Sequence, residues 1–454
     1  MYIDSHAHLD DHKFDPDREA AIQRAFDAGV DWIIQIGTDI KSSEFSIKLA
    51  EQYPHIYATV SIHPHDAKSF TEENYLTLRE LAKHPKVIAI GEIGLDYHYD
   101  FSPRDIQLTT FRRLMELAAD LKKPVVIHSR EADTETMQVL TEFKDKVKGV
   151  LHCFSGDEKM LKESIHLGYY ISIAGPVTYP KSTRMQELVK KIPMPRLLIE
   201  TDCPYLSPQS HRGKRNEPSY VIETAAKIGE LRGFSATDIG RNTAINAKTL
   251  FGIPIPDEPS IAYQTRNSLY LNITNRCTNN CYFCVRSYTD YIVGHNLRLK
   301  KEPTVEEIIA AIGDPKRYKE IVFCGYGEPT LRLEVIKSVA KWLKEQGVIV
   351  RLDTNGHGNI INKRNIVPEL KGLIDAVSVS LDAETAEQYN RICRPVFGDT
   401  TFQQVIEFIQ ECKKLLPEVG ITVVGVPEVN EQQCRNLANE LGVKFRFRVY
   451  NEVG

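Results

Sequence analysis

Three cysteines lie within eight positions of this chain, in the stretch NRCTNNCYFC at residues 275–284. They are Cys277, Cys281 and Cys284, and the whole chain of 454 residues has only nine cysteines. A structural zinc site closes its tetrahedron with four protein ligands, whereas a redox CxxC pair needs only two. Three thiolates in one loop therefore predict a metal centre that is one ligand short. The alternative is a zinc knuckle that takes Cys324 or Cys393 as its fourth ligand.

A second set of potential metal ligands lies in the first half of the chain, where short apolar runs end in histidine or a carboxylate. These residues are His6, His8, His63, His65, Glu92, His128, His152 and Asp202. His6 and His8 would point to one face of a strand, because strand side chains alternate. His63 taken alone is more typical of a hydrogen-bonded structural histidine.

Imidazole and carboxylate groups together suit zinc, manganese or other borderline divalent metals. The set exceeds what one ion requires, so it predicts two metals that share a carboxylate. Two metals about 4 Å apart can activate a water molecule and stabilise both oxygens of a displacement at phosphorus.

The runs that carry these ligands alternate with amphipathic segments, which is typical of repeated βα units. We count eight of them: YIDSHAH, WIIQIG, YATVSIHPH, VIAIGEIGLD, PVVIHS, GVLHCFSG, YYISIAG and RLLIETDCP. Eight parallel strands with covering helices predict a closed (β/α)8 barrel of TIM type. The carboxyl ends of its strands meet at one mouth, which would bring the ligands together.

The second half of the chain predicts a smaller α/β domain. Six further strands, SLYLNIT, EIVFCGYGEP, VIVRLDTNG, AVSVSLD, GITVVGVP and KFRFRVY, fall short of a closed barrel and predict an open (βα)6 partial barrel. Prolines crowd the stretch FGIPIPDEPSIAYQ between the halves. We therefore expect a first domain over 1–252, a Pro-rich linker over 253–265 and a second domain over 266–454.

Composition narrows the class of protein. The formal net charge is −4 and the pI is about 6.4, which does not indicate a histone-like or membrane-seeking protein. Nine cysteines are too few for a disulfide scaffold of this length. The start MYIDSHAHLD does not read as a signal peptide, and no apolar run approaches the roughly 20 residues that span a bilayer. We expect a soluble, cytoplasmic protein with no membrane partner.

The motifs of the first half resemble the TatD family of metal-dependent deoxyribonucleases, in the amidohydrolase superfamily. The matching stretches are DSHAHLD, SIHPHD, GEIGLDYHYD, VIHSREA, LHCFSG, IETDCPYLSP and RGKRNEPSY. The resemblance implies that a pair of divalent metals (Mg, Mn or Zn) is held by six residues: His6, His8, Glu92, His128, His152 and Asp202. It also implies that Glu92 bridges the metals and that Asp202 is both a ligand and the general base for the attacking water.

Further residues of these motifs suit an anionic substrate. Arg130 can form two hydrogen bonds to a phosphate, Ser155 and Gly156 can offer donors, and His65 can steady a leaving oxygen. HRGKR at 211–215, which includes Arg212 and Lys214, predicts a track for a phosphodiester backbone. The alternative for this stretch is a solvated charged loop. Glu200, on the same strand face as Asp202, would orient a metal ligand.

The second half resembles the radical S-adenosylmethionine (SAM) superfamily. Its CxxxCxxC spacing with aromatic Phe283 implies a [4Fe–4S] cluster on Cys277, Cys281 and Cys284, whose fourth iron is open to SAM. An electron from the cluster would cleave SAM to a 5′-deoxyadenosyl radical.

GYGEPTL at 325–331 resembles the GGEP motif of the same superfamily. There Glu328, followed by Pro329, would accept from the SAM amine, while Gly325 and Gly327 allow close backbone approach. Other residues expected to contact SAM are Asn355, Ser378 and Ser380, with Val423 and Val424 as an apolar wall for the adenine.

The combination resembles a TatD-associated radical SAM protein with both domains in one chain. Three functions remain open. The chain could hydrolyse phosphodiesters and modify a nucleotide; it could hydrolyse a small ester, amide or phosphate that the radical domain makes or consumes; or the radical domain could activate a partner enzyme. The expected partners are a nucleic acid or nucleotide substrate and an external electron donor, and the sequence does not indicate the oligomeric state.

Overall fold

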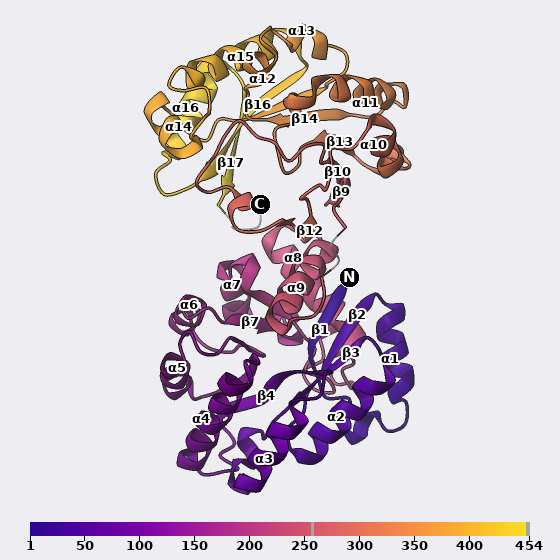
Figure 1. Ribbon diagram of the computed structural model, residues 1–454, viewed down its shortest axis with the longest axis vertical. Helices are drawn as coiled ribbons and strands as arrows, with labels where there is room; N and C mark the ends of the chain where they lie inside the picture. Colours follow the sequence, from indigo (N-terminus) through magenta and orange to yellow (C-terminus); the bar gives the residue numbers. More distant parts are fainter. Residues whose placement is uncertain (256–257, 451–454) are drawn as a thin grey trace. The chain divides into compact units, whose positions relative to one another are not determined.

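The structure, a computed structural model, describes residues 1–255 and 258–450 (Figure 1). The chain divides into two compact units, Met1–Pro256 and Asp257–Gly454. The division falls inside the segment 253–265 that the sequence analysis assigned to a linker, of which residues 256–257 lie outside the described residues.

The first unit is built on eight parallel strands that follow one another in chain order around the sheet. Their bounds are β1 (Tyr2–Ala7), β2 (Val30–Gln35), β3 (Ile56–Val60), β4 (Val87–Asp96), β5 (Val125–Arg130), β6 (Gly149–Leu151), β7 (Tyr170–Ile173) and β8 (Leu197–Ile199). Each strand coincides with one of the eight apolar runs. All six residues of β1 are buried, as expected for strands covered on both faces.

The sheet closes on itself between its first and last strands. The N–H of Asp202 donates to the carbonyl of His6 at 2.9 Å, and the N–H of His8 donates to the carbonyl of Cys203 at 2.8 Å. These bonds join the end of β1 to the segment after β8, so the predicted (β/α)8 barrel is confirmed. They also place two ligand-bearing strand ends side by side.

Nine helices of the described residues surround these strands in Figure 1. They are α1 (Arg18–Asp27), α2 (Ile40–Gln52), α3 (Glu72–Leu81), α4 (Arg104–Leu121), α5 (Asp133–Glu142), α6 (Glu158–His166), α7 (Thr183–Lys191), α8 (Val221–Arg232) and α9 (Ala236–Phe251). Local signals start and stop them. A capping box at Ser235 opens α9, and Gly252 in the left-handed conformation, with φ +68°, ends it.

The second unit is an open sheet of seven strands in the order β17-β16-β15-β14-β13-β10-β9. Six are parallel and in chain order: β10 (Ser268–Leu271), β13 (Glu320–Phe323), β14 (Val350–Thr354), β15 (Ala376–Ser380), β16 (Glu418–Gly425) and β17 (Lys444–Val449). These are the six predicted strands of the partial barrel. The seventh, β9 (Ala262–Thr265), pairs antiparallel with β10. The assignment of 253–265 wholly to a linker was therefore wrong, because Ala262–Thr265 completes the edge of this sheet.

The helices of the second unit lie along one side of its sheet (Figure 1). They are α10 (Val305–Ile312), α11 (Leu333–Glu345), α12 (Gly358–Asn362), α13 (Val367–Leu370), α14 (Ala386–Cys393), α15 (Thr401–Leu415) and α16 (Glu431–Leu441). In the sequence, a small hairpin of β11 (Tyr291–Ile292) and β12 (His295–Asn296) comes between β10 and β13. None of the helices among the described residues combines the length and the apolar character that crossing a membrane requires.

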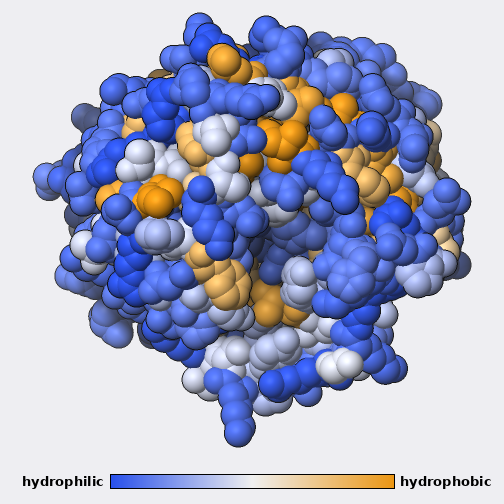
Figure 2. Space-filling view, turned by 90° about the horizontal axis from the view of Figure 1, so that it is seen from below, coloured by the Kyte–Doolittle hydropathy of each residue, from blue (hydrophilic) through white to orange (hydrophobic). Residues whose placement is uncertain are grey.

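Hydrophilic side chains cover most of the face shown in Figure 2, with hydrophobic ones in small groups and a hollow near the centre. The apolar side chains are mostly inside, and many residues of the barrel strands are completely buried.

Gly94 on β4 shows how tightly the barrel strands that carry the ligands pack. Its φ is +137°, and a Cβ added there would lie 2.0 Å from the backbone oxygen of His128 on β5. We expect Gly94→Ala to lower the free energy of unfolding of the first unit by more than about 2 kcal/mol, because both strain and a backbone clash act at this position.

Gly168 provides a matched control, since its φ is +89° but no atom lies within 4 Å of the added Cβ. Gly168→Ala should cost about 1 kcal/mol from strain alone. Calorimetry on the full chain measures both, and equal losses would contradict the close approach of β4 to β5.

Candidate functional sites

Glu92, in the middle of β4, lies at the centre of the ligand set that the sequence predicts. Its Oε2 is 3.3 Å from His6 Nε2 and 3.7 Å from His8 Nε2. Its Oε1 is 2.8 Å from His128 Nδ1 and 2.6 Å from His152 Nε2. Each carboxylate oxygen therefore faces its own group of histidines.

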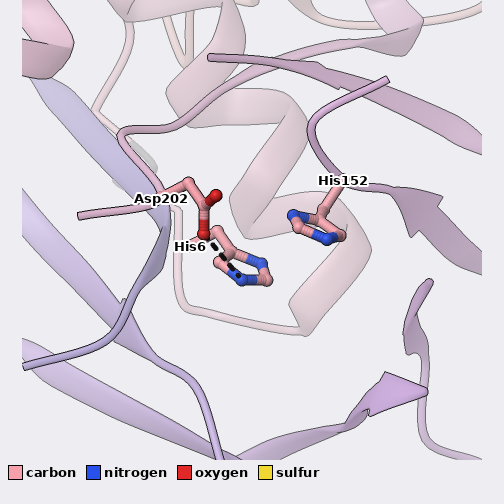
Figure 3. Close-up of side chains that lie close together, drawn as sticks. All are labelled: His6, His152 and Asp202. Carbon is pink, nitrogen blue, oxygen red and sulfur yellow. Dashed lines mark ion pairs between the residues drawn. The ribbon is translucent and has the colours of Figure 1, made fainter. Parts of the chain in front are cut away.

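Asp202 completes the side of the site that Oε2 faces. Its Oδ1 is 3.4 Å from His8 Nε2 and 3.6 Å from His6 Nε2. Figure 3 shows His6, His152 and Asp202 converging from the ends of different strands. Asp202 has φ +55°, a conformation that a residue other than glycine rarely adopts. Such strain is typical of functional sites, where the surrounding structure imposes it.

His63 also joins the cluster, on the side that Oε1 faces. Its Nε2 is 3.4 Å from Glu92 Oε1. One of three groups that could hold a metal ion consists of His63, Glu92 and His128. The structural role that the sequence favoured for His63 alone was therefore too narrow. Only the convergence of β3, β4 and β5 reveals this contact.

The donor set fits divalent cations. His6 Nε2 lies 3.1 Å from His8 Nε2, and His128 Nδ1 lies 3.3 Å from His152 Nε2. Ring nitrogens that converge so closely repel one another if all are protonated, whereas neutral imidazole nitrogens are good metal ligands. Burial lowers the pKa of His63 to about 4, which keeps this ring neutral.

The charge of Glu92 persists despite its burial. Burial alone would raise the pKa of Glu92, but the charge of neighbouring His152 and the hydrogen bond from His128 hold it well below its usual range. Burial opposes protonation of His8 in the same way, yet its hydrogen bond to Asp202 and the charge of that carboxylate raise the pKa of His8 to about 9. The site thus keeps the buried Glu92 carboxylate charged, which suits cations.

Asp96, at the end of β4, positions two of these histidines. Its Oδ2 is 3.0 Å from His128 Nε2 and 2.9 Å from His65 Nε2. A carboxylate on the far nitrogen of a ligand histidine fixes the ring and its tautomer. Asp96 was not among the predicted site residues, although it lies in the motif GEIGLDYHYD.

Two more acidic side chains, Glu200 and Asp4, contact residues next to the predicted metal ligands. Glu200 Oε1 is 3.4 Å from His152 Nδ1 and accepts from the Cys153 N–H at 2.6 Å, which is consistent with the orienting role expected for it. Asp4 accepts from the N–H and the hydroxyl of Thr201 at 2.9 and 2.6 Å. Burial raises the pKa of Asp4 to about 8.

The residues expected to bind substrate lie around the mouth of the barrel, and some of them already contact other residues of the chain. The Arg130 guanidinium stacks over the Tyr99 ring, 4.7 Å from its centroid. Ser155 is exposed, but its carbonyl and that of Gly156 accept hydrogen bonds from Arg184. The peptide groups of this loop are therefore tied to α7.

Two of the charged residues in HRGKR are already paired with acidic residues. His211 Nε2 is 2.8 Å from Glu223, and Arg215 forms an ion pair with Asp17. Arg212 and Lys214 are exposed, and within residues 1–255 and 258–450 neither forms an ion pair. The track of cations is therefore shorter than the sequence suggested, because the partner acids come from α8 and from the segment before α1.

The three cysteines of the second unit lie in the loop after β10, each half-buried. The Asn279 N–H donates to Cys277 Sγ at 3.5 Å, and the Arg286 Nε donates to Cys284 Sγ at 3.4 Å. Hydrogen bonds to cysteine sulfur of this kind tune iron–sulfur centres. The loop thus presents three thiols, two of them hydrogen-bonded, near the carboxyl ends of the strands.

Two other cysteines bear on the zinc alternative. Cys393 is buried, and its carbonyl accepts a hydrogen bond from the Asn280 N–H at 2.9 Å, so it lies beside the loop. Cys324 follows β13, and the charges of Arg448 and Arg351 act on it. Cys393 is therefore a fourth cysteine next to the three of the loop.

Glu328 ties the GEP motif to the end of β14. Its Oε1 accepts from the N–H and hydroxyl of Thr330 and from the Thr354 hydroxyl, and its Oε2 accepts from the Asn355 N–H at 2.8 Å. The expected bond from the SAM amine to Glu328 stays a prediction, because these four contacts already use its carboxylate.

The glycines of this motif pack closely against the chain itself. A Cβ at Gly327 would lie 2.3 Å from the Arg276 carbonyl, and one at Gly325 would lie 2.5 Å from Asn272 Oδ1. Pro329 begins a 3-10 turn, Pro329–Arg332, directly after Glu328. The motif is thereby held against the cysteine loop.

Other predicted SAM contacts lie on both faces of the sheet. Asn355 Nδ2 is 3.9 Å from Cys277 Sγ, and Phe283 packs at the edge of the apolar core. Ser378 and Ser380 share one face of β15, where the Ser378 hydroxyl is 2.7 Å from that of Thr422. Val423 and Val424 cannot both line one wall, because strand neighbours point to opposite faces. Val423 is buried in the core under the helices, so the expectation for it was wrong.

The first unit is therefore a (β/α)8 barrel with a histidine–carboxylate cluster at the carboxyl ends of its strands, the arrangement of a metal-dependent hydrolase. The chain belongs to the TatD related DNase family, whose profile matches residues 3–252. Residues 271–441 match the Radical SAM superfamily. Both resemblances stated from the sequence are confirmed, and both families are enzymes.

Known relatives match the first unit over their whole length. The metal-dependent hydrolase YabD of Bacillus subtilis is 43% identical over 254 residues, which are 56% of this chain and 100% of that protein. The 3′-5′ ssDNA/RNA exonuclease TatD of Escherichia fergusonii is 38% identical over 257 residues, 55% of this chain and 99% of that protein. The crystal structure of YJJV, a TatD homologue from Escherichia coli K12, is 32% identical, covers 56% of this chain and 98% of its own, and has a TM-score of 0.53.

Asp96 gives a direct test of how the cluster is positioned. Asp96→Asn removes the charge that holds His128 and His65, so we expect metal affinity to fall by about 10- to 100-fold. Asp100→Asn, in the same loop but paired with Arg104 at the surface, should leave the affinity unchanged. Titration of metal-free protein with Mn²⁺ measures both, and an equal affinity for wild type and Asp96→Asn would show that Asp96 does not position the ligands.

Proposed function

We propose that this chain is a bifunctional enzyme. Its first unit hydrolyses phosphodiester bonds of single-stranded nucleic acid with divalent metals, and its second unit cleaves SAM reductively for radical chemistry. The observation that carries the first part is Glu92, which presents one oxygen to His6 and His8 and the other to His63, His128 and His152.

In this proposal Glu92, His6, His8, His128, His152 and Asp202 would hold a pair of divalent metal ions. Two such ions, when bound, lower the pKa of a water molecule and neutralise charge on the phosphate. Asp202 acts as the general base. Its hydrogen bond to His8 and the nearby histidine charges lower its pKa even though burial opposes this, so it is ionised and can accept a proton.

Exposed aromatic rings beside the cluster support a single-stranded nucleic acid as the substrate. Tyr99 and Phe101 are 48% and 54% exposed, and their rings stack with centroids 5.2 Å apart. His65 contacts both rings, at 5.4 and 4.8 Å, and is joined to His128 through Asp96. Bases stack on such platforms irrespective of sequence. Arg130, over the Tyr99 ring, can contact a phosphate.

A third exposed ring lies on the other side of the cluster. Tyr205 is 48% exposed, its ring centroid is 6.4 Å from that of His8, and Lys13 lies over it at 4.6 Å. Aromatic rings paired with cations on both sides favour an extended polyanion over a small ester, the runner-up substrate class. The name of the relative TatD, a 3′-5′ ssDNA/RNA exonuclease, agrees with this assignment.

In the second unit we propose that Cys277, Cys281 and Cys284 hold a [4Fe–4S] cluster. When bound, the cluster supplies the electron that cleaves SAM. Arg286 and Asn279 hydrogen-bond to two of the sulfurs, and Glu328 fixes Asn355 beside Cys277.

Nuclease activity tests the role of the first unit. The Mn²⁺-loaded full chain should shorten end-labelled single-stranded DNA, and Asp202→Ala should reduce the rate by about 10²- to 10⁴-fold because the general base is lost. Asp120→Ala, on the surface of α4, is the control. Cleavage at the wild-type rate by Asp202→Ala would remove this mechanism.

Substrate class is tested by the rings of Tyr99 and Phe101. Replacing both by alanine should raise KM for single-stranded DNA by about tenfold or more, since each base stack contributes about 1–3 kcal/mol. Hydrolysis of bis(p-nitrophenyl) phosphate, which has no successive bases to stack along the rings, should change much less. Leu76→Ala, 57% exposed on α3, is the control. Equal effects on both substrates would favour the small-ester alternative.

The cluster is tested by SAM cleavage. Anaerobically reconstituted protein with SAM and dithionite should release 5′-deoxyadenosine and contain about four iron atoms per chain. Cys277→Ala should do neither, whereas Cys434→Ala, on α16, should retain both. Zinc in place of iron, with no SAM cleavage by the wild type, would instead support the knuckle.

A further inference from the structure

The sheet of the second unit has two faces of opposite character. Side chains such as Phe323, Leu352 and Ile421 are buried under the helices in one apolar core. The opposite face, which we call the inner face, carries polar residues that alternate with them. Six of these matter here: Tyr270, Arg351, Asp353, Ser378, Arg446 and Arg448. The alternation is explicit in β14 and β15, where every second residue is only half-buried.

Strand register aligns the inner-face residues in rows across the sheet. Asp353 pairs with Ser378, Thr422 with Arg446, and Val424 with Arg448. Along β14 the inner face leads toward the cysteine loop. Asp353 is two residues, about 7 Å, before Asn355 on the same face, and the side chain of Asn355 contacts Cys277. The inner face therefore continues directly into the proposed SAM site.

One arginine of the inner face is held in place by its neighbours. Arg351 Nε is 3.3 Å from Glu320, its Nη1 is 3.2 Å from Asp353 Oδ1, and its Nη2 donates to the Tyr270 hydroxyl at 3.3 Å. Yet Arg351 Nε and Asp353 Oδ1, both buried, make no hydrogen bond of acceptable geometry. Buried polar atoms rarely lack a hydrogen-bond partner unless a further group supplies one.

The two arginines of β17 differ from Arg351. Arg446 and Arg448 are exposed, and no described residue forms an ion pair or hydrogen bond with either guanidinium. Both nevertheless act on the inner face: burial raises the pKa of Asp353, and the charges of Arg351, Arg448 and Arg446 oppose that rise. Lys444, on the same face of the same strand, is instead paired with Glu418 at 2.7 Å. Two cations without partners thus stand over a polar surface that solvent reaches.

We propose that the inner face binds the phosphate of a nucleoside monophosphate, with Arg446 and Arg448 as the phosphate ligands. Each guanidinium can donate two parallel hydrogen bonds, and two of them match a phosphomonoester dianion better than a single carboxylate. The hydroxyls of Ser378, Thr422 and Tyr270 supply the donors and acceptors that a ribose or deoxyribose needs. The substrate would then lie against Asp353, beside the end of the sheet where SAM is expected.

This site also suggests a place in a reaction sequence, and it rests on the proposed function of the second unit. Hydrolysis of a phosphodiester consumes water and leaves a phosphomonoester and a hydroxyl. A nuclease that removes one nucleotide at a time from the end of a strand therefore releases nucleoside monophosphates. The inner face would take a product of the kind that the first unit is proposed to make.

Calorimetric titration of the full chain tests the proposal. The reconstituted protein, saturated with SAM, carries Asp202→Ala and is kept in EDTA, so that metals in the barrel cannot hold phosphate. The probes are the four deoxynucleoside 5′-monophosphates, each compared with its own nucleoside. We expect at least one monophosphate to bind at least about tenfold more tightly than its nucleoside. Arg446→Gln and Arg448→Gln should each remove about tenfold of that affinity, and Lys444→Gln should remove none.

Two further measurements distinguish failure of this proposal from an unfolded variant and from failure of the function proposed for the second unit. Arg448→Lys keeps the charge but loses the two-pronged donor, so it should bind with intermediate affinity, which a merely unfolded variant would not do. If no monophosphate binds more tightly than its nucleoside, or if the double variant Arg446→Gln/Arg448→Gln binds like wild type, the proposal is overturned. Failure of the wild type to cleave SAM would overturn the function of the unit instead, and it is measured separately.

Discussion

The structure of the first unit depends on one buried carboxylate among histidines. Glu92 is almost fully enclosed and stays charged only because imidazoles approach both of its oxygens. A buried charge without partners would cost many kcal/mol. The strands β1, β3, β4, β5 and β6 must therefore end at the same level, so that their histidines reach it. Asp96, Glu200 and Asp4 then fix the histidines and the loop before Asp202, so a second layer of carboxylates supports the first.

Much of this could be predicted from the sequence, for a physical reason. Parallel strands buried on both faces read as continuous apolar runs, and the polar residue that ends such a run lies at the mouth of the barrel. The eight strands and the convergence of their terminal histidines follow from these two facts. The same reasoning located the six parallel strands of the second unit and the cysteine loop after the first of them.

The rest depended on contacts between distant elements. The role of His63 required the position of Glu92 one strand away, and that of Asp96 required two histidines from different strands. Arg215 is neutralised by Asp17, about 200 positions earlier in the chain. Strand β9 is short and pairs antiparallel at an edge, so its sequence carries no strong periodic signal. The error at Val423 was avoidable, because the alternation of side chains along a strand already excludes it.

The two units use their sheets differently. A closed barrel of eight strands fills its interior with side chains, so chemistry is confined to the mouth. The second sheet stays open, and its inner face keeps arginines, carboxylates and hydroxyls within reach of solvent. This contrast explains why the first unit presents exposed rings around a compact cluster, while the second offers a polar surface beside the cysteine loop.

The central claim is that Glu92 organises two metal ions rather than one. A crystal of the full chain soaked in Mn²⁺ and measured at the manganese absorption edge tests it most directly. The account predicts two anomalous peaks about 4 Å apart, one on each side of Glu92, with His6 and His8 around the first and His128 around the second. A single peak, or two peaks that Glu92 does not bridge, would contradict it.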